Sequence, residues 1–212
     1  MRLPDPPLLL ITDRKQAVRP LDEVLAAAFA AGCRWASLRE KDLPAAEQAA
    51  LARALLPLAR SFGAMLTLHG QPELAAEAGL DGVHLPEGGD VSHARAVLGP
   101  GALVGLSLHR PGVADPAADY VIAAPVFLTQ SKPGYGPALG HAGLAAMVAA
   151  AGRPVIALGG IAPQQVPGCL TAGAAGIAVM GGVMRASDPG ADVRELFASM
   201  KRPAGVSSGR PG

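Results

Sequence analysis

The chain has 212 residues, of which 50% are apolar and only 17% are charged, so it can bury a core and lacks the composition of a disordered protein. Its 27 glycines and 20 prolines follow no three-residue period, which excludes a collagen triple helix. The net charge of +1 and the 3% aromatic content provide neither a basic surface for a phosphodiester backbone nor many rings for base stacking, so no nucleic-acid partner is expected.

Nothing in the sequence predicts export or membrane insertion. No apolar run reaches the length of a membrane-spanning helix, and the first residues, MRLPDPP, lack the apolar core of a signal peptide. Cys33 and Cys169 are far apart and neither belongs to a CxxC motif, so we expect both to be reduced. These features predict a cytoplasmic protein with no membrane partner.

Short apolar runs alternate with Ala-rich amphipathic stretches along the chain. The short runs are rich in Val, Ile and Leu, which is typical of buried parallel strands, and they occupy residues 8–12, 35–40, 65–69, 82–85, 103–109, 120–126, 155–159 and 177–181. The amphipathic stretches predict helices over 21–31, 45–61, 72–78, 92–98, 143–151, 163–172 and 191–200. Between the fifth and sixth strands, residues 112–117 leave room for only a brief helix or none.

Proline and glycine mark the helix ends. Pro72 and Pro163 suit a first helical position. Glycines that end Ala-rich helices predict left-handed C-caps at Gly32, Gly63, Gly79, Gly152 and Gly173.

Eight strand–helix units predict an α/β fold, a compact (β/α)8 TIM barrel. A doubly wound open sheet is the alternative, because periodicity alone does not separate the two. The number of units, the burial of every strand and the glycines after the last two strands favour the barrel. We expect one barrel domain over residues 1–202 and a flexible C-terminal tail over 203–212.

Two glycine doublets follow the last two strands. In a TIM barrel the active site lies at the carboxyl ends of the strands, where Gly159-Gly160 and Gly181-Gly182 stand. Glycine lets backbone N–H groups approach an anion closely, so the two doublets predict a phosphate-binding cup. The alternative is that each glycine only permits a tight turn.

Three cations, Arg39, Lys41 and Lys132, fall at or just past strand ends and suit a diphosphate or a second phosphate; the alternative is three solvated surface charges. Lys132 belongs to a long irregular loop, residues 127–140, which has the length of a lid or binding loop. In that loop Thr129 and Ser131 could close over a phosphate.

Two histidines end strands and are candidate proton carriers, His69 and His109. No HxH or HExxH motif predicts a tightly held metal. Asp90, with Glu87, could bind a Mg²⁺ shared with a diphosphate, or both could be ordinary loop acids.

Seven segments in order resemble one family over nearly the whole chain. They are Leu38-Arg39-Glu40-Lys41, Asp81-Gly82-Val83-His84-Leu85, Gly105-Leu106-Ser107-Leu108-His109, Ala118-Asp119-Tyr120-Val121, Pro125-Val126-Phe127, Ser131-Lys132 after Thr129, and Ala157-Leu158-Gly159-Gly160-Ile161. The chain resembles the family of thiamine-phosphate synthase and the TenI-type thiazole tautomerase.

The resemblance implies an enzyme of thiamine biosynthesis whose partners are small phosphates: a thiazole phosphate, a hydroxymethylpyrimidine diphosphate and the product thiamine phosphate. By this likeness, Arg39, Lys41 and Lys132 hold the diphosphate and Ser107 lines the pyrimidine side. Thr129 and Ser131 hydrogen-bond phosphate or thiazole, and Gly159 with the backbone of Gly181-Gly182 cradles the thiazole phosphate. Apart from the resemblance, Ala-rich helices on a compact barrel are compatible with a homodimer.

The chain departs from both branches of the family. Ser37 stands where the synthase has Gln, and Gly70 replaces the carboxylate that binds Mg²⁺. Pro125 replaces the tautomerase histidine. A synthase is therefore our first hypothesis and a tautomerase using His69 or His109 the second. A non-catalytic thiamine-phosphate-binding protein is the third. A more distant alternative is another phosphate-binding barrel isomerase, with an acid–base pair drawn from Glu40, His69, Glu87, Asp90 and His109.

Overall fold

The computed structural model describes residues 3–129, 131 and 137–201, and in it eight parallel strands close into a barrel in the order β1 to β8. This confirms the predicted (β/α)8 barrel and excludes the open sheet. The strands are β1 (Leu8–Ile11), β2 (Trp35–Leu38), β3 (Met65–His69), β4 (Gly82–Leu85), β5 (Leu103–Leu108), β6 (Tyr120–Ala123), β7 (Val155–Leu158) and β8 (Gly176–Val179).

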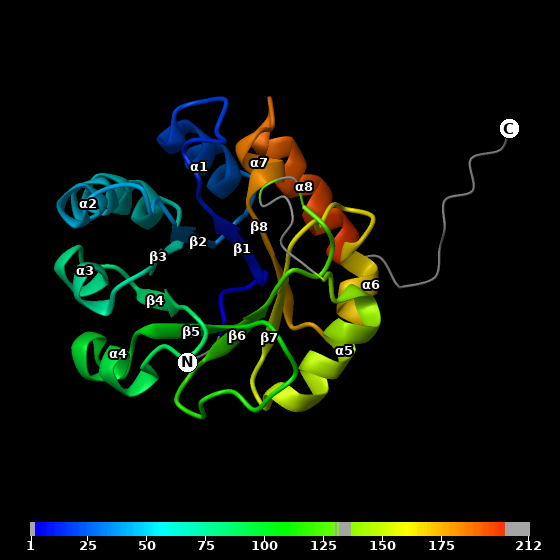
Figure 1. The fold of residues 1–212 in the computed structure, drawn as a ribbon. Helices are drawn as coiled ribbons and strands as arrows, with labels where there is room; N and C mark the ends of the chain where they lie inside the picture. Colours follow the sequence, from blue (N-terminus) through cyan, green and yellow to red (C-terminus); the bar gives the residue numbers. More distant parts are fainter. Residues whose placement is uncertain (1–2, 130, 132–136, 202–212) are drawn as a thin grey trace, which may run out of the picture.

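Helices surround the closed sheet (Figure 1). They are α1 (Leu21–Ala30), α2 (Ala45–Ser61), α3 (Pro72–Glu77), α4 (Val91–Leu98), α5 (Gly140–Ala151), α6 (Val166–Thr171), α7 (Gly181–Met184) and α8 (Pro189–Met200). No helix forms in residues 109–119, as the short connection predicted. None of the helices in the described part of the chain has the length and apolarity needed to cross a bilayer. The predicted tail at 203–212 lies outside the described residues.

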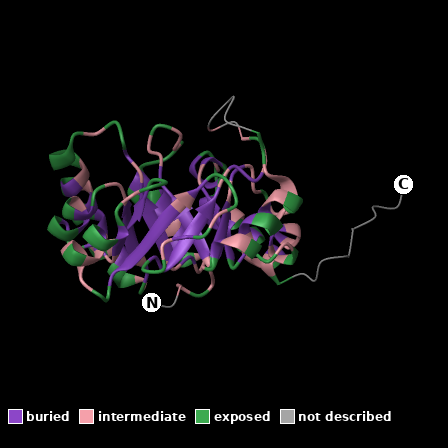
Figure 2. Cartoon of the chain, turned by 60° about the horizontal axis from the view of Figure 1, so that its bottom comes forward, coloured by how far each residue is buried: buried purple, intermediate pink, exposed green. Residues whose placement is uncertain are grey.

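The core has two layers, because alternate residues of each strand face opposite sides. One cluster packs the outer face of the strands against the helices, for example Leu10 and Leu38 with Val24 and Phe29. The other cluster fills the inside of the barrel and consists of Leu9, Ile11, Trp35, Leu103, Tyr120, Ile122, Ile156 and Ala178. Figure 2 shows the strands as the most continuously buried part of the molecule, with exposed residues on the helices and loops.

Several predicted boundaries are wrong, each for a local reason. The strand predicted at 120–126 ends at Ala123, and Pro125 has no amide with which to continue the ladder. The helix predicted from Pro163 begins at Val166, because the side chain of Gln165 accepts the Ala162 amide and forms a turn instead. The strand predicted at 177–181 ends at Val179. Gly181, the last residue of the predicted strand, belongs instead to the unpredicted helix α7.

Other details agree with the sequence. Pro72 begins α3, and all five glycines predicted as C-caps have positive φ. Helices α4, α5 and α8 begin one to three residues earlier than predicted. Cys33 and Cys169 are buried and form no disulfide.

Candidate active site at the carboxyl ends of the strands

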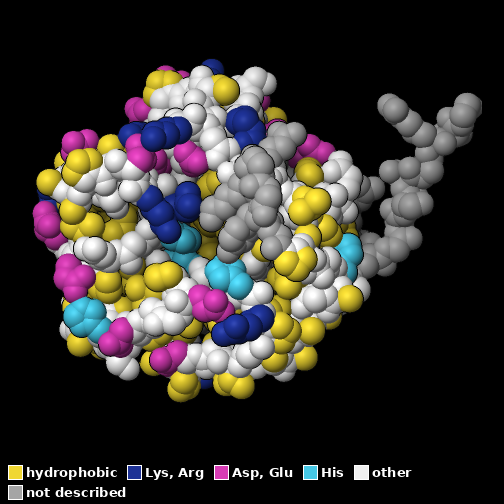
Figure 3. Space-filling view, viewed as in Figure 1, with side chains coloured by type: hydrophobic (Ala, Val, Ile, Leu, Met, Phe, Trp, Pro, Cys, Tyr) yellow, Lys and Arg dark blue, Asp and Glu magenta, His cyan; other side chains and the backbone are white. Residues whose placement is uncertain are grey.

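A cavity of about 470 Å³ opens at the carboxyl ends of the strands. This volume falls in the range of small-molecule sites. Its walls combine apolar strand residues with glycines and a few polar groups: Ile11, Arg39, His69, Ser107, His109, Ile122, Ala124, Pro125, Leu128, Thr129, Ser131, Leu158, Gly159, Gly160, Ile161, Ala162, Ala178, Val179, Met180, Gly181, Gly182 and Arg185. Histidine, lysine and arginine side chains gather around the centre of the face shown in Figure 3.

Ten of the predicted site residues line this cavity together: Arg39, His69, Ser107, His109, Thr129, Ser131, Gly159, Gly160, Gly181 and Gly182. Alternation of side chains along a strand explains why the first four face the cavity. Each lies an even number of residues after a residue of its own strand that faces the barrel interior, so it faces inward too. Lys41 and Asp90 do not line the cavity. Lys132 lies outside the described residues.

The two glycine doublets reach the cavity from neighbouring strands, since β7 pairs with β8. Gly159 and Gly160 also allow the loop after β6 to approach closely. The Phe127 amide donates to the Gly159 carbonyl at 2.9 Å, and a Cβ on Gly159 would lie 2.9 Å from Pro125 Cα. Gly160 has a φ of +60°, and a Cβ there would lie 2.9 Å from Phe127 Cβ. Gly159 and Gly160 are therefore needed for close packing of the loop, as the tight-turn alternative predicts, and they also line the cavity.

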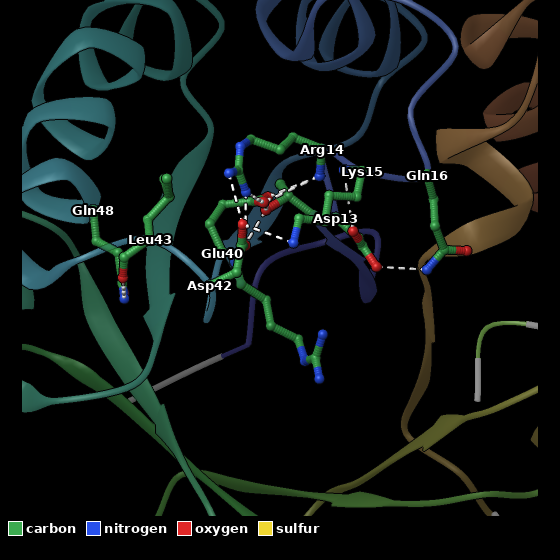
Figure 4. Close-up of polar contacts among 10 residues, drawn as sticks. Asp13, Arg14, Lys15, Gln16, Glu40, Asp42, Leu43 and Gln48 are labelled. Atoms are coloured by element: carbon green, nitrogen blue, oxygen red, sulfur yellow. Dashed lines mark hydrogen bonds and ion pairs between the residues drawn. The ribbon is translucent and has the colours of Figure 1, made fainter.

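Arg39 is half-buried, and its backbone is fixed by a neighbouring strand. Its amide donates to Thr12 Oγ1 at 3.0 Å. The same hydroxyl donates to Glu40 Oε1 at 2.6 Å, and Glu40 is only 3% exposed. Glu40 Oε2 also accepts the Arg14 amide at 3.1 Å, and Figure 4 shows this cluster. Glu40 thus serves to position its neighbours, and its carboxylate is engaged rather than directed at the cavity.

Lys41 lies close enough to Arg39 for their charges to interact. Burial lowers the pKa of Lys41 below 10.5, and repulsion from Arg39 lowers it further. The charge of Lys41 also contributes, after burial, to the lowered pKa of His84. The two cations therefore create a positive potential beside the cavity, suited to a ligand with several negative charges.

A polar chain of three residues lies below the cavity. The ring of His84 is fully buried, its Nε2 lies 2.9 Å from Ser107 Oγ, and its Nδ1 lies 3.2 Å from Tyr120 Oη. Burial lowers the pKa of His84 to about 3, so the imidazole is neutral at physiological pH. The ring of His69 packs against that of His84 at a centroid distance of 4.4 Å. This chain fixes the Ser107 hydroxyl in the cavity wall.

The acids predicted to bind Mg²⁺ make other contacts in the described structure. Asp90 is the N-cap of α4, where its Oδ1 accepts the His93 amide at 2.8 Å, and Gly70 has no side chain. Glu87 Oε1 accepts the His109 amide at 3.4 Å. Within residues 3–129, 131 and 137–201, no three His, Cys, Asp or Glu side chains are grouped to hold a metal ion. The described side chains therefore form no Mg²⁺ site from protein donors alone, whereas a Mg²⁺ shared with a diphosphate needs only one or two carboxylates.

The sequence did not predict Arg185 or Gln16 as site residues. Arg185 lines the cavity, and its Nη1 donates to Gln16 Oε1 and to Ser131 Oγ, the latter at 3.4 Å. Arg185 follows Gly181 by four residues, and in a helix this spacing places the later side chain over the earlier residue. The spacing indicates a site residue only when α7 is known to be a helix, and the sequence does not predict α7.

Comparisons with known proteins agree on one family. The family model described as thiamine monophosphate synthase matches residues 8–183. A relative named "Putative thiamine-phosphate synthase" from Geobacter sulfurreducens is 44% identical over 197 residues, covering 90% of this chain and 92% of that protein. The thiamine-phosphate synthase of Laribacter hongkongensis is 39% identical over 179 residues, covering 82% of this chain and 85% of that protein.

Two solved structures share the fold, and the first of them also agrees with this family. The thiamine phosphate pyrophosphorylase from Pyrococcus furiosus superposes with a TM-score of 0.78 at 27% identity, covering 92% of this chain and 95% of that one. A 3-hexulose-6-phosphate synthase superposes with a TM-score of 0.65 at 20% identity, covering 91% of this chain and 99% of that one. The latter likeness is one of fold alone.

Proposed function

The chain belongs to the thiamine monophosphate synthase family, and from this premise we propose that it joins a thiazole phosphate to hydroxymethylpyrimidine diphosphate. The products are thiamine phosphate and diphosphate. The observation that carries the proposal is that one cavity brings both glycine doublets together with Arg39 and Ser107.

The reaction replaces one bond by another. The lone pair of the thiazole nitrogen forms a bond to the exocyclic methylene carbon of the pyrimidine. The bond from that carbon to the diphosphate oxygen breaks, and the diphosphate leaves with the electron pair. No proton has to be removed, so the enzyme needs no nucleophile and no general base. Catalysis then consists of orienting two substrates and stabilising charge on the leaving group.

The described residues can divide these tasks. Arg39 and Lys41 stabilise the negative charge that develops on the diphosphate, because they are neighbouring cations just past the carboxyl end of β2. Ser107, fixed by His84, hydrogen-bonds the pyrimidine. The glycine doublets, with Thr129 and Ser131, bind the thiazole phosphate. Lys132 is assigned to the diphosphate only through the family likeness, and no step is assigned to a metal ion.

The test is a product assay. The purified protein is mixed with both substrates and Mg²⁺, and thiamine phosphate is measured by chromatography. We expect product from the parent and about a 100-fold loss of kcat/KM in Arg39→Ala, the size of effect seen on removing one charge-stabilising group. Arg53→Ala is the matched control, because Arg53 lies on α2 and pairs with Glu77 on the surface.

One outcome of the product assay contradicts the proposed function. A parent protein that binds both substrates yet yields no thiamine phosphate contradicts the synthase proposal. A parallel assay then separates the alternatives. Isomerisation of a carboxylated thiazole phosphate, lost in His69→Ala or His109→Ala, supports a tautomerase. Tight binding of thiamine phosphate with neither activity supports a binding protein.

A further inference from the structure

The guanidinium of Arg185 lies over the first glycine of α7, at the edge of the cavity. A Cβ built on Gly181 would lie 2.8 Å from Arg185 Nη2, so the guanidinium rests where any other residue at 181 would place its side chain. Arg185 lines the same cavity as Gly159 and Gly160. The side chain is therefore a cation directly beside the glycines assigned to a phosphate.

The contacts of Arg185 hold it without neutralising it. Nη1 donates to the Gln16 side-chain oxygen and to the Ser131 hydroxyl, both of which are uncharged. Among the described residues, no carboxylate lies within ion-pair distance of Arg185, and none accepts a hydrogen bond from its Nε or Nη2. With respect to the described residues, the guanidinium is therefore not neutralised, and its Nε and Nη2 make no hydrogen bond to them.

Gln16 is itself fixed in place. Its Nε2 donates to Asp13 Oδ2 at 2.5 Å, as Figure 4 shows, and its Oε1 accepts from Ser131 Oγ at 3.0 Å. The Val18 amide donates to the Met184 carbonyl at 3.1 Å, so the loop after β1 is attached to α7 by its backbone as well. Gln16 thus orients Arg185 from an anchored position.

We propose that Arg185 binds the phosphate ester of the thiazole substrate and that Gln16 is its positioning residue. This inference rests on the proposed function and extends its phosphate site from backbone glycines to a charged side chain. An arginine edge forms two parallel N–H···O bonds to a phosphate, which is the geometry that guanidinium favours. A neutral amide at position 16 is required, because a carboxylate there would pair with Arg185 and cancel its charge.

Binding measurements by calorimetry test this directly. Each protein is titrated with the thiazole phosphate and, separately, with the thiazole alcohol that lacks the phosphate. We expect Arg185→Ala to lower affinity for the ester about 10- to 100-fold and to leave affinity for the alcohol unchanged. Gln16→Glu should lower ester affinity in the same direction while Arg185 is still present. Arg194→Ala, an exposed arginine on α8, is the matched control and should bind as the parent does.

Arg185→Lys separates charge from geometry, and circular dichroism with thermal unfolding verifies that each variant folds. The lysine variant should recover only part of the ester affinity, because an ammonium cannot form two parallel bonds. Equal ester affinity in the parent and Arg185→Ala, or an equal loss for ester and alcohol, overturns the proposal. A parent that binds the ester but forms no thiamine phosphate contradicts only the proposed function, whereas an active parent whose KM for the ester is unchanged in Arg185→Ala contradicts only this inference.

Discussion

Thr12 and Glu40 form a 2.6 Å hydrogen bond between two buried side chains, and Thr12 also accepts the amide of Arg39. One hydroxyl therefore connects a buried carboxylate in the end of the barrel to a cation of the cavity. The acid beside Arg39 has a structural role, which removes Glu40 from the acid–base pairs considered for an isomerase.

Replacing Glu40 by Ala should destabilise the fold. The change leaves the Thr12 hydroxyl and the Arg14 amide without their acceptor, and it leaves the Arg14 guanidinium without one of its two carboxylates. We expect the free energy of unfolding to fall by about 3 kcal/mol, measured by urea denaturation. Glu195→Ala, an exposed acid on α8, should stay within about 0.5 kcal/mol of the parent. Equal stability of both variants would contradict the structural role of Glu40.

The alkaline limb of the pH–rate profile should depend on Arg39. In the proposed function Lys41 stabilises the diphosphate only while protonated, and burial, followed by Arg39, lowers its pKa below 10.5. The rate should therefore fall at a pH below 10.5 in the parent. In Arg39→Gln the repulsion is absent, so the midpoint should move to higher pH although the rate itself is lower. Arg53→Gln should leave the midpoint in place; an unchanged midpoint in Arg39→Gln would show that Lys41 is not the titrating group.

Gly160 and Gly182 should respond differently to alanine. At Gly160 the backbone has positive φ and the new Cβ would meet Phe127, so we expect a loss of about 2 kcal/mol or more in unfolding free energy. A Cβ at Gly182 meets no atom within 4 Å, and Gly182 lies in a helix, so Gly182→Ala should fold at least as stably as the parent. Thermal unfolding compares the two variants. A stable Gly160→Ala would mean that the loop after β6 does not pack as closely as described.

Mild acid should destabilise the protein through His84. The pKa of the buried imidazole is about 3, whereas the exposed group in the unfolded chain has a pKa near 6.5. The unfolded state therefore binds more protons between these values. The free energy of unfolding should decrease as pH falls below 6.5, by at most about 1.4 kcal/mol per pH unit.

Urea denaturation between pH 7 and pH 4.5 measures this slope, and His84→Gln should flatten it. The carboxyls of Asp42, Glu73 and Asp119 also have lowered pKa values in the folded state, so they add to the slope below about pH 5, and the comparison between pH 7 and about pH 5 isolates His84. The same slope in His84→Gln and the parent would assign the acid sensitivity to another group.

The fold was predictable because its signals are local and repeat eight times. Each strand is a short apolar run, and each preceding helix ends where a glycine such as Gly79 or Gly173 can adopt positive φ. The errors in element boundaries have local causes that an apolar or amphipathic pattern does not reveal. Pro125 ends a strand early, and the four residues of α7 are too few to produce a periodic pattern.

The site was predictable where the alternation of side chains along a strand decides which residues face the cavity. Ser107 in β5 and His109 just after it are two residues apart and so face the same side, and both reach the cavity at the carboxyl end. Arg185 could not be inferred in this way, because its position depends on α7 and on Gln16, which lies 169 residues away in sequence. Asp90 has the acidic side chain expected of a metal ligand, but it stands directly before α4 and accepts the His93 backbone amide, so it is a helix cap.

The pairing of β1 with β8 has a consequence for biosynthesis. Leu8 lies beside Ile177, so one neighbour of the first strand is made almost last. Until the ribosome has released that segment, the growing sheet is an open ribbon with two bare edges, each able to recruit a strand from another nascent polypeptide. Ring closure is thus a late event of high contact order.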